Sequence, residues 1–259
     1  MGTVLKCKGD IDAAIKSYEQ AIRIKPDFAE AFNNIGISLV ANGQLVAAIA
    51  NYKKAVKINP NSAEIYNNMG IALQNKGELD AAMDSYKETL RIEPDHIHAY
   101  NNMGTILKEK GKLDAAIESY KQALKINPDF VEAHNNMGSA FKDKGELDAA
   151  ISSYTQAINL KQGYTDALMN RWQLFFDKKE FEAALSDTDS CDNKTSRACG
   201  LETLYALGRI DEIYKRIEAS FEVDDENIRL AAFSSYIAER EKKDTAHNFC
   251  PNPLSLIYF

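Results

Sequence analysis

Apolar and small side chains recur along the chain at the spacing of an amphipathic α-helix, in pairs of stripes. In residues 97–130 the first stripe consists of Tyr100, Met103, Gly104 and Leu107. After a glycine, the second stripe consists of Leu113, Ala116, Ile117, Tyr120, Ala123 and Leu124. Side chains three and four positions apart lie on one face of a helix, so this segment predicts two amphipathic helices that pack together.

The pair of stripes repeats along the chain. Its clearest marker is a four-residue stretch that occurs, 34 residues apart, as Asn33-Asn34-Ile35-Gly36, Asn67-Asn68-Met69-Gly70, Asn101-Asn102-Met103-Gly104 and Asn135-Asn136-Met137-Gly138. A fixed period of this length predicts an array of identical units, each of which packs only on its neighbours. We therefore expect an all-α solenoid rather than one globular core.

Glycine and proline mark where the helices end. The turn between the two helices of a unit carries Gly43, Gly77, Gly111 or Gly145, and the second helix ends before Pro60, Pro94 or Pro128. Glycine supplies the left-handed conformation that ends a helix, and proline cannot continue one. Two more positions are small where the paired helices approach closely: Gly36, Gly70, Gly104 and Gly138 on the first helix, and Ala48, Ala82, Ala116 and Ala150 on the second.

This pattern resembles the tetratricopeptide repeat (TPR). The matching features are the small residues at the eighth and twentieth positions, a proline near the end, and a tyrosine at the twenty-fourth position, which is Tyr52, Tyr86, Tyr120 or Tyr154. The resemblance covers residues 9–160. It implies a right-handed superhelix of antiparallel helix pairs whose first helices line a concave groove.

The period divides the chain into eight expected segments. They are a truncated first TPR at 1–28, four full TPRs at 29–62, 63–96, 97–130 and 131–164, a degenerate TPR at 165–195, a degenerate helix pair plus capping helix at 196–241, and an extended apolar tail at 242–259. The chain begins in the middle of what the period predicts as a first helix.

The degenerate unit at 165–195 departs from the pattern. Trp172 replaces the close-contact glycine and Lys179 replaces the turn glycine. A tryptophan cannot occupy that gap, so we expect the helix pair to splay or the ring to turn onto the next element. The polar stretch from Asp187 to Thr195 predicts a loop.

Charge and composition limit the partners. The net charge is -7 and the pI is about 5.3, whereas nucleic acids and anionic membranes require a basic patch. No apolar run is long enough to cross a bilayer. Four cysteines in 259 residues do not make a disulfide framework, so we expect free thiols in a reducing compartment and a cytoplasmic location.

The sequence contains no recognisable catalytic motif, so we expect a non-catalytic protein without a cofactor. His96 and His98 lack a third metal ligand, and His134 occupies a packing position shared with Phe32, Tyr66 and Tyr100. A zinc site made of Cys191, Cys199, His247 and Cys250 is the alternative, but these spacings match no zinc motif.

The paired asparagines are the candidate binding residues. Asparagine is a middling helix former, so two in tandem at one place in helix after helix are not explained by helix stability. We name as the asparagine ladder Asn33, Asn34, Asn67, Asn68, Asn101, Asn102, Asn135, Asn136 and Asn170. An amide matches the N–H and C=O groups of an extended peptide, and the arrangement resembles the asparagine ladder in the TPR superhelix of O-linked N-acetylglucosamine transferase. The alternative is that one asparagine of each pair stabilises the fold by bonding between helices.

The residues around the ladder suggest the partner's charge. Glu30, Glu64, Glu132 and Asp166, with His98 between them, occupy the starts of the first helices. Lys and Arg, which some TPR domains use there to hold a terminal carboxylate, are absent from these places. We therefore expect an extended protein or peptide segment that is neutral or basic, held by a non-catalytic scaffold.

Two other functions remain open. In the first alternative, the chain is the substrate-recruiting arm of a larger enzyme, of the glycosyltransferase, sulfotransferase or iron-dependent oxygenase type, whose catalytic domain lies beyond Phe259. In the second, the chain self-associates because the truncated first unit or the C-terminal tail docks on a second copy.

Overall fold

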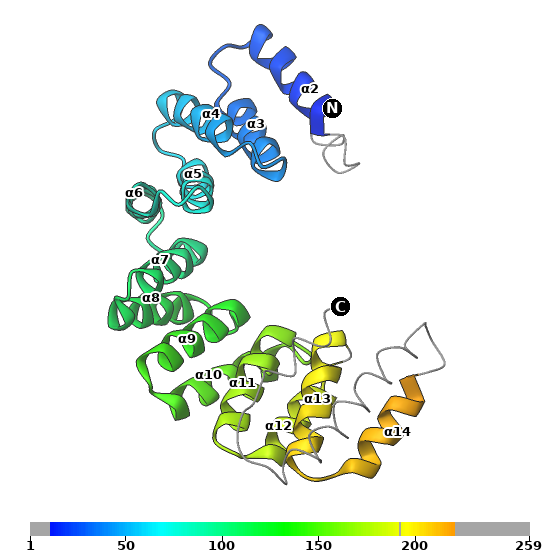
Figure 1. The fold of residues 1–259 in the computed structure, drawn as a ribbon. Coiled ribbons are helices and arrows are strands. Elements are labelled where there is room, and N and C mark those ends of the chain that lie inside the picture. Colours follow the sequence, from blue (N-terminus) through cyan, green and yellow to red (C-terminus); the bar gives the residue numbers. More distant parts are fainter. Residues whose placement is uncertain (1–10, 192, 221–259) are drawn as a thin grey trace. The chain divides into compact units, whose positions relative to one another are not determined.

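The structure is a computed structural model that describes residues 11–191 and 193–220. Within these ranges it contains thirteen α-helices and no strand (Figure 1), so the prediction of an all-α fold is confirmed. The helices are α2 (Ile11–Ile24), α3 (Ala29–Ala41), α4 (Leu45–Ile58), α5 (Ala63–Asn75), α6 (Leu79–Ile92), α7 (Ile97–Glu109), α8 (Leu113–Ile126), α9 (Val131–Lys144), α10 (Leu147–Leu160), α11 (Thr165–Asp177), α12 (Phe181–Asp189), α13 (Lys194–Ala206) and α14 (Ile210–Ser220).

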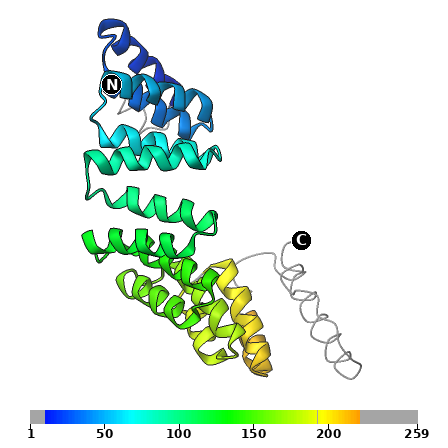
Figure 2. The same ribbon diagram turned by 90° about the vertical axis from the view of Figure 1, so that its left-hand side faces the viewer.

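The described part of the chain divides after Ser153, within the α10 sequence, into two compact units, and each is described by itself. In the first unit, α3 packs on α4, α5 on α6 and α7 on α8 (Figures 1 and 2). We call α3, α5, α7 and α9 the first helices. They also contact one another in succession, and they therefore form one continuous layer of the first unit.

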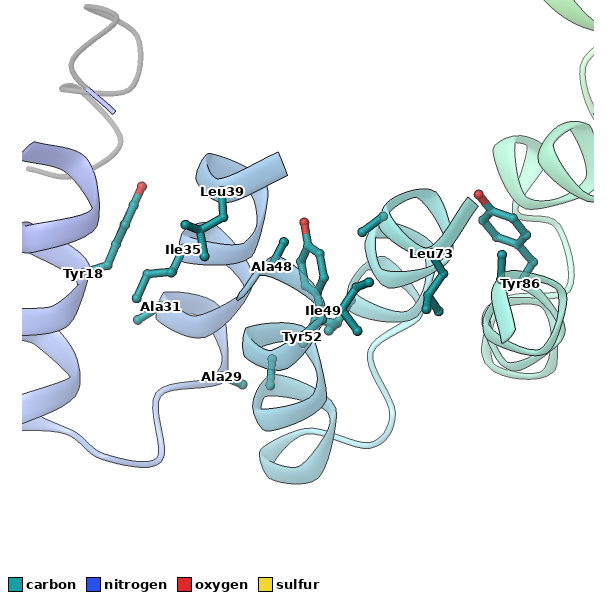
Figure 3. Packing of buried hydrophobic residues seen from close by; sticks show 14 of the residues in the cluster. Tyr18, Ala29, Ala31, Ile35, Leu39, Ala48, Ile49, Tyr52, Leu73 and Tyr86 are labelled. Atoms are coloured by element: carbon teal, nitrogen blue, oxygen red, sulfur yellow. The ribbon is translucent and has the colours of Figure 1, made fainter. Parts of the chain in front are cut away.

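A glycine and a tyrosine hold each helix pair of the first unit together. Tyr52 and Tyr86 are almost fully buried, and Figure 3 shows Tyr52 between the helices of its pair. A Cβ placed on Gly36 would lie 2.5 Å from Cε1 of Tyr52, and one on Gly70 would lie 2.5 Å from Cε1 of Tyr86. Atoms cannot approach that closely, so the tyrosine ring occupies the space that the missing side chain leaves. The predicted close contact is confirmed.

The second unit has different residues at the positions of this contact. Trp172 stands where Gly70 stands in its repeat, and Thr188 stands where Tyr86 stands. The Trp172 ring is 6 % exposed, and its Nε1 donates to Oγ1 of Thr203 on α13 at 2.9 Å. Of the two expected outcomes, the ring has turned onto the next element.

The predicted loop from Asp187 to Thr195 is shorter in the structure, where it lies between α12 and α13. Asp187 lies in α12, which ends at Asp189, and α13 begins at Lys194, where Asn193 and Ser196 form a capping box. Arg171 donates to both carboxylate oxygens of Asp187, from Nη2 at 2.5 Å and from Nε at 3.0 Å. This buried ion pair explains why a polar residue belongs to a packed helix.

Several predictions fall outside the described residues. They concern the start of the truncated first unit at 1–10, the capping helix expected before residue 241, and the apolar tail at 242–259. The unit boundaries stay predictions.

Candidate functional site

Eight of the nine residues of the asparagine ladder lie on the layer of first helices. In each of these helices the first asparagine of the pair is buried, with exposed fractions of 5 % for Asn33, 8 % for Asn67, 9 % for Asn101 and 9 % for Asn135. The second asparagine, which is Asn34, Asn68, Asn102 or Asn136, is half-buried. Adjacent residues on a helix point about 100° apart, so one asparagine faces the neighbouring helix and the other stands at the edge of that contact.

A hydrogen bond between successive repeats joins the two kinds of asparagine. Nδ2 of Asn68 donates to Oδ1 of Asn33 at 3.1 Å. Nδ2 of Asn136 donates to Oδ1 of Asn101 at 3.0 Å. Asn33 and Asn101 thus have the interhelical role that was the alternative for one asparagine of each pair. The bond fixes the orientation of the second amide, whose NH₂ group has another N–H and whose oxygen is an acceptor.

A glutamate extends this arrangement at the first junction. Nδ2 of Asn33 donates to Oε1 of Glu64, in the first turn of α5, at 3.1 Å. The pattern of paired asparagines does not predict this bond. Asn33 and Glu64 are 31 residues apart in the sequence, one helical turn less than the period. Lys108 and Ser139 have the same separation, and Nζ of Lys108 donates to Oγ of Ser139 at 2.9 Å.

The junction between α5 and α7 is different. The Asn102 side chain is hydrogen-bonded to the Tyr86 hydroxyl, and that hydroxyl donates to Oε1 of Gln74 at 3.1 Å. Oδ1 of Asn67 is buried and has no hydrogen-bond partner within the part of the chain that the structure describes. His98 stands where the other repeats have an acid, and its ring lies edge-on to Phe130, with 5.3 Å between the centroids.

The fifth second-position asparagine belongs to the second unit. Asn170 lies on α11 and is half-buried, and Met169 precedes it where the first unit has asparagine. The assignment of all nine ladder residues to peptide binding stays a prediction, as does the resemblance to the ladder of O-linked N-acetylglucosamine transferase.

The charges on the first-helix layer change along the first unit. The helices α3 and α5 contain Glu30 and Glu64 and no Lys or Arg. On α7, Nζ of the half-buried Lys108 lies 3.8 Å from the Asp143 carboxylate. The repeat pattern does not predict this ion pair. The helices α3 and α5 therefore carry carboxylate hydrogen-bond acceptors and no cationic side chain of their own.

The buried tyrosines next to the ladder remain neutral at physiological pH. Burial raises the pKa of Tyr86 well above its usual range, and the hydrogen bond from Asn102 partly opposes this shift. Burial likewise raises the pKa of Tyr120 to about 12, and Thr105 accepts from its hydroxyl at 3.4 Å. These phenols act as neutral hydrogen-bonding groups.

No group of three or more His, Cys, Asp or Glu residues that could hold a metal ion occurs among the described residues. Cys191 and Cys199 are free thiols, and burial raises the pKa of Cys199 to about 11. The other two members of the alternative zinc site, His247 and Cys250, lie outside the described residues. In the ranges 11–191 and 193–220 no helix has both the length and the apolar character needed to cross a membrane.

Comparison with protein families gives a consistent result. Family models described as TPR repeat or tetratricopeptide repeat match residues 2–43, 36–77, 63–96, 85–118, 104–145 and 131–164. Together they cover more than half of the chain. The chain belongs to the tetratricopeptide-repeat family.

Solved TPR structures resemble this chain. The crystal structure of MamA is 29 % identical in sequence, with a TM-score of 0.58, and the match covers 62 % of this chain and 94 % of MamA. YrrB, described as a TPR protein with an unusual peptide-binding site, is 22 % identical with a TM-score of 0.56 over 76 % of this chain and 99 % of its own. A TPR protein from Parabacteroides merdae is 18 % identical with a TM-score of 0.66 over 87 % of this chain and 91 % of its own. The last two likenesses show the fold only. No curated protein matches the sequence.

TPR membership supports the coarser part of the functional prediction. Proteins built from these repeats are generally non-catalytic scaffolds for protein interactions, and this chain has such repeats over residues 2–164. The TPR chain is therefore a protein-interaction scaffold.

Proposed function

We propose that the first helices of this TPR scaffold hold an extended polypeptide segment through its main chain. The second asparagines Asn34, Asn68, Asn102 and Asn136 contact the segment. At two junctions a first asparagine of the preceding repeat holds the second one in position. Asn170 has the corresponding place in the second unit. The observation that carries this proposal is the bond from Asn68 to Asn33, which recurs from Asn136 to Asn101 with almost the same length.

The spacing of the helices suits an extended peptide. Packed helix axes lie about 8–10 Å apart, and an extended chain rises about 3.3 Å per residue. One asparagine therefore meets the peptide roughly once in three residues. A main-chain contact at this interval needs no particular side chain on the partner, so binding depends little on its sequence.

The charges favour a neutral or basic partner. Glu30, Glu64 and Glu132 are exposed at the starts of the first helices. An acidic segment along this layer would be repelled, whereas a basic segment would be attracted. The prediction of no nucleic-acid partner rests on the net charge of -7.

The proposal is tested with a twelve-residue peptide selected on the wild-type chain from a display library. Replacing Asn68 and Asn102 by Ala should weaken its binding by about 1 kcal/mol or more for each lost pair of backbone bonds. The control replaces Asn51 and Gln122, on the second helices α4 and α8, and should leave the affinity unchanged. Unchanged affinity in the Asn68/Asn102 variant, with its fold intact by circular dichroism, would remove the ladder from the mechanism.

The enzyme-arm alternative and self-association stay predictions, because the first ten residues and the tail at 242–259 lie outside the described residues. The absence of a catalytic role and the cytoplasmic location are likewise proposals.

A further inference from the structure

A hollow of about 460 Å³ opens between α2 and α4 in the first unit. This volume lies in the range of pockets that take ligands, about 300–1,000 Å³. Its apolar lining comes from Ile15 and Ile22 of α2 and from Phe32, Ile35 and Leu39 of α3. Ile15, Ile22 and Phe32 are half-buried, whereas Ile35 and Leu39 are 5 % and 7 % exposed. The hollow therefore presents apolar side chains to solvent above a packed base.

The hollow lies on another side of α3 from the asparagine ladder. Figure 3 shows Ile35 on the side of α3 that faces α2. Successive residues of a helix point about 100° apart, so Asn33 and Asn34 are turned by about 100° and 200° from Phe32. A partner seated in the hollow leaves the ladder free, and the two surfaces can be tested separately.

The repeat sequence explains why a hollow forms at this junction. Ile35 lies at its base, where the three following repeats have a methionine: Met69, Met103 and Met137. Methionine is long and unbranched and fills irregular gaps, and Met69 and Met103 pack against the core of the first unit. The branched isoleucine reaches less far, so the space above it stays open.

Two cations stand at the apolar lining. Arg23 of α2 and Lys54 of α4 both line the hollow, and both are exposed. Glu19, which also lines it, lies one helical turn before Arg23 and compensates that charge in part. At the next junction the equivalent places of the two cations hold opposite charges, Lys57 and Glu88. The hollow between α2 and α4 is thus the more positive of the two.

Lys54 is the cation that a ligand in the hollow meets. Its Nζ lies 5.6 Å from the centre of the Phe32 ring, and it has no ion pair with a residue in the described part of the chain. An uncompensated ammonium beside an apolar surface favours a partner that brings a carboxylate together with large apolar side chains. A purely apolar segment would desolvate the ammonium without supplying a counter-charge, which is costly.

We propose that the hollow between α2 and α4 docks an acidic and apolar segment of a second protein. Its large apolar side chains contact Ile15, Ile22 and Phe32, and its Asp or Glu side chain pairs with Lys54. The ladder favours a neutral or basic segment, whereas the hollow favours an acidic one. The scaffold can therefore bring together two partners of opposite charge on different sides of α3.

The test selects twelve-residue peptides by display on the full wild-type chain and discards those that also bind the Ile35→Met/Lys54→Glu chain. Ile35→Met fills the hollow with the side chain of the later repeats, and Lys54→Glu reverses the uncompensated charge. The surviving peptides should carry Asp or Glu beside large apolar residues. Each single substitution should weaken their binding about tenfold. Lys53→Glu is the control, because Lys53 is exposed outside the hollow, and it should weaken binding less than about twofold.

The Asn68→Ala/Asn102→Ala variant separates the hollow from the ladder. It should bind the surviving acidic peptides as tightly as the wild type does, and a ladder peptide should bind the wild type together with an acidic one. Competition between the two peptides would place both on one surface and contradict the proposal. Ladder peptides that ignore the two asparagine changes would overturn main-chain binding and leave the hollow standing.

Other outcomes would overturn the docking of an acidic segment. They are surviving peptides without an acid, equal losses from Lys53→Glu and Lys54→Glu, or no surviving peptide at all. If peptides then bound only after Leu256 and Ile257 of the full chain were changed to Ser, the chain's own tail would be the occupant. Were Ile35→Met not folded by circular dichroism, selection against Lys54→Glu alone gives the same decision.

Discussion

At the scale of single residues, the ladder combines two roles in each pair of asparagines. The first asparagine is buried, and at two junctions it accepts a hydrogen bond that orients the second asparagine of the next repeat. Such preorganisation lowers the entropy that a ligand must remove on binding. The α5–α7 junction differs, because Asn102 is bonded to Tyr86 there and Oδ1 of Asn67 has no partner among the described residues.

This difference predicts unequal costs for equal substitutions. Asn101→Ala removes the acceptor of Asn136 and should lower the free energy of unfolding by about 1 kcal/mol. Asn67→Ala removes a buried acceptor that has no partner in the described residues, so it should cost less than about 0.5 kcal/mol. Urea denaturation of the two variants measures both values. Equal destabilisation would mean that Asn102 bonds to Asn67 in solution.

The sequence located the ladder but did not distinguish the members of each pair. The period of 34 residues shows which positions are equivalent, whereas burial depends on how each helix is rotated toward its neighbour. For the same reason, the bond from Asn102 to Tyr86 could not be anticipated. Both asparagines of a pair are polar, so the pattern of apolar positions contains no information on which one is covered.

At the scale of the element, the contact between a glycine and a tyrosine sets the distance between paired helices. The second unit has other residues in these two places, Trp172 and Thr188, and the Trp172 ring donates to Thr203 on the next helix.

A methyl group at this contact should be harmful in the first unit. Gly70→Ala places a Cβ within 2.5 Å of the Tyr86 ring and should destabilise the fold by about 1–3 kcal/mol. Combining it with Tyr86→Thr, which imitates the second unit, should cost less than the sum of the two single changes. Chemical denaturation of the four chains completes this cycle. Simple additivity would indicate that the two residues do not compete for space.

The turn before α12 is strained by its residue type. Lys179 has a φ of 60°, the left-handed conformation that glycine adopts at the corresponding turns. Lys179→Gly should therefore raise the free energy of unfolding by about 0.5–1 kcal/mol. Lys178→Gly is the control, because Lys178 has a right-handed conformation and glycine there should destabilise. A gain in stability from both substitutions would contradict this explanation.

The loop predicted at Asp187 to Thr195 begins too early for a physical reason. Polar residues in a row resemble a solvated turn, yet Asp187 is 1 % exposed and is held by Arg171, which also donates to Oγ1 of Thr155 at 2.7 Å. The compensation comes from residues that are distant in the sequence. A local pattern cannot reveal such a pairing.

At the scale of the whole molecule, the fold was predictable because each repeat interacts mainly with its neighbours. A 34-residue period then specifies the architecture almost by itself. The period could not specify the C-terminal part, where the contacts at Trp172 and Asp187 replace those of the regular repeats.

The buried tyrosines should make the free energy of unfolding of the first unit fall at alkaline pH. Their folded-state pKa values are raised above the ordinary value of 10.0, so the stabilisation is complete below pH 10 and is lost as the pH rises beyond it. Each such tyrosine should steepen the loss by up to about 1.4 kcal/mol per pH unit. Urea denaturation between pH 9 and 11 measures the slope. Tyr120→Phe should make it shallower, and an unchanged slope would show that Tyr120 does not contribute.

Main-chain recognition by the asparagine ladder is the central claim, and a cycle between the peptide backbone and the ladder tests it most directly. The affinity of a selected peptide is measured before and after N-methylation of single backbone amides, on the wild type and on the Asn68→Ala/Asn102→Ala variant. Methylation at the ladder positions should weaken binding to the wild type by about 1 kcal/mol per amide and have little effect on the variant. Equal losses on both chains would contradict main-chain recognition by these asparagines.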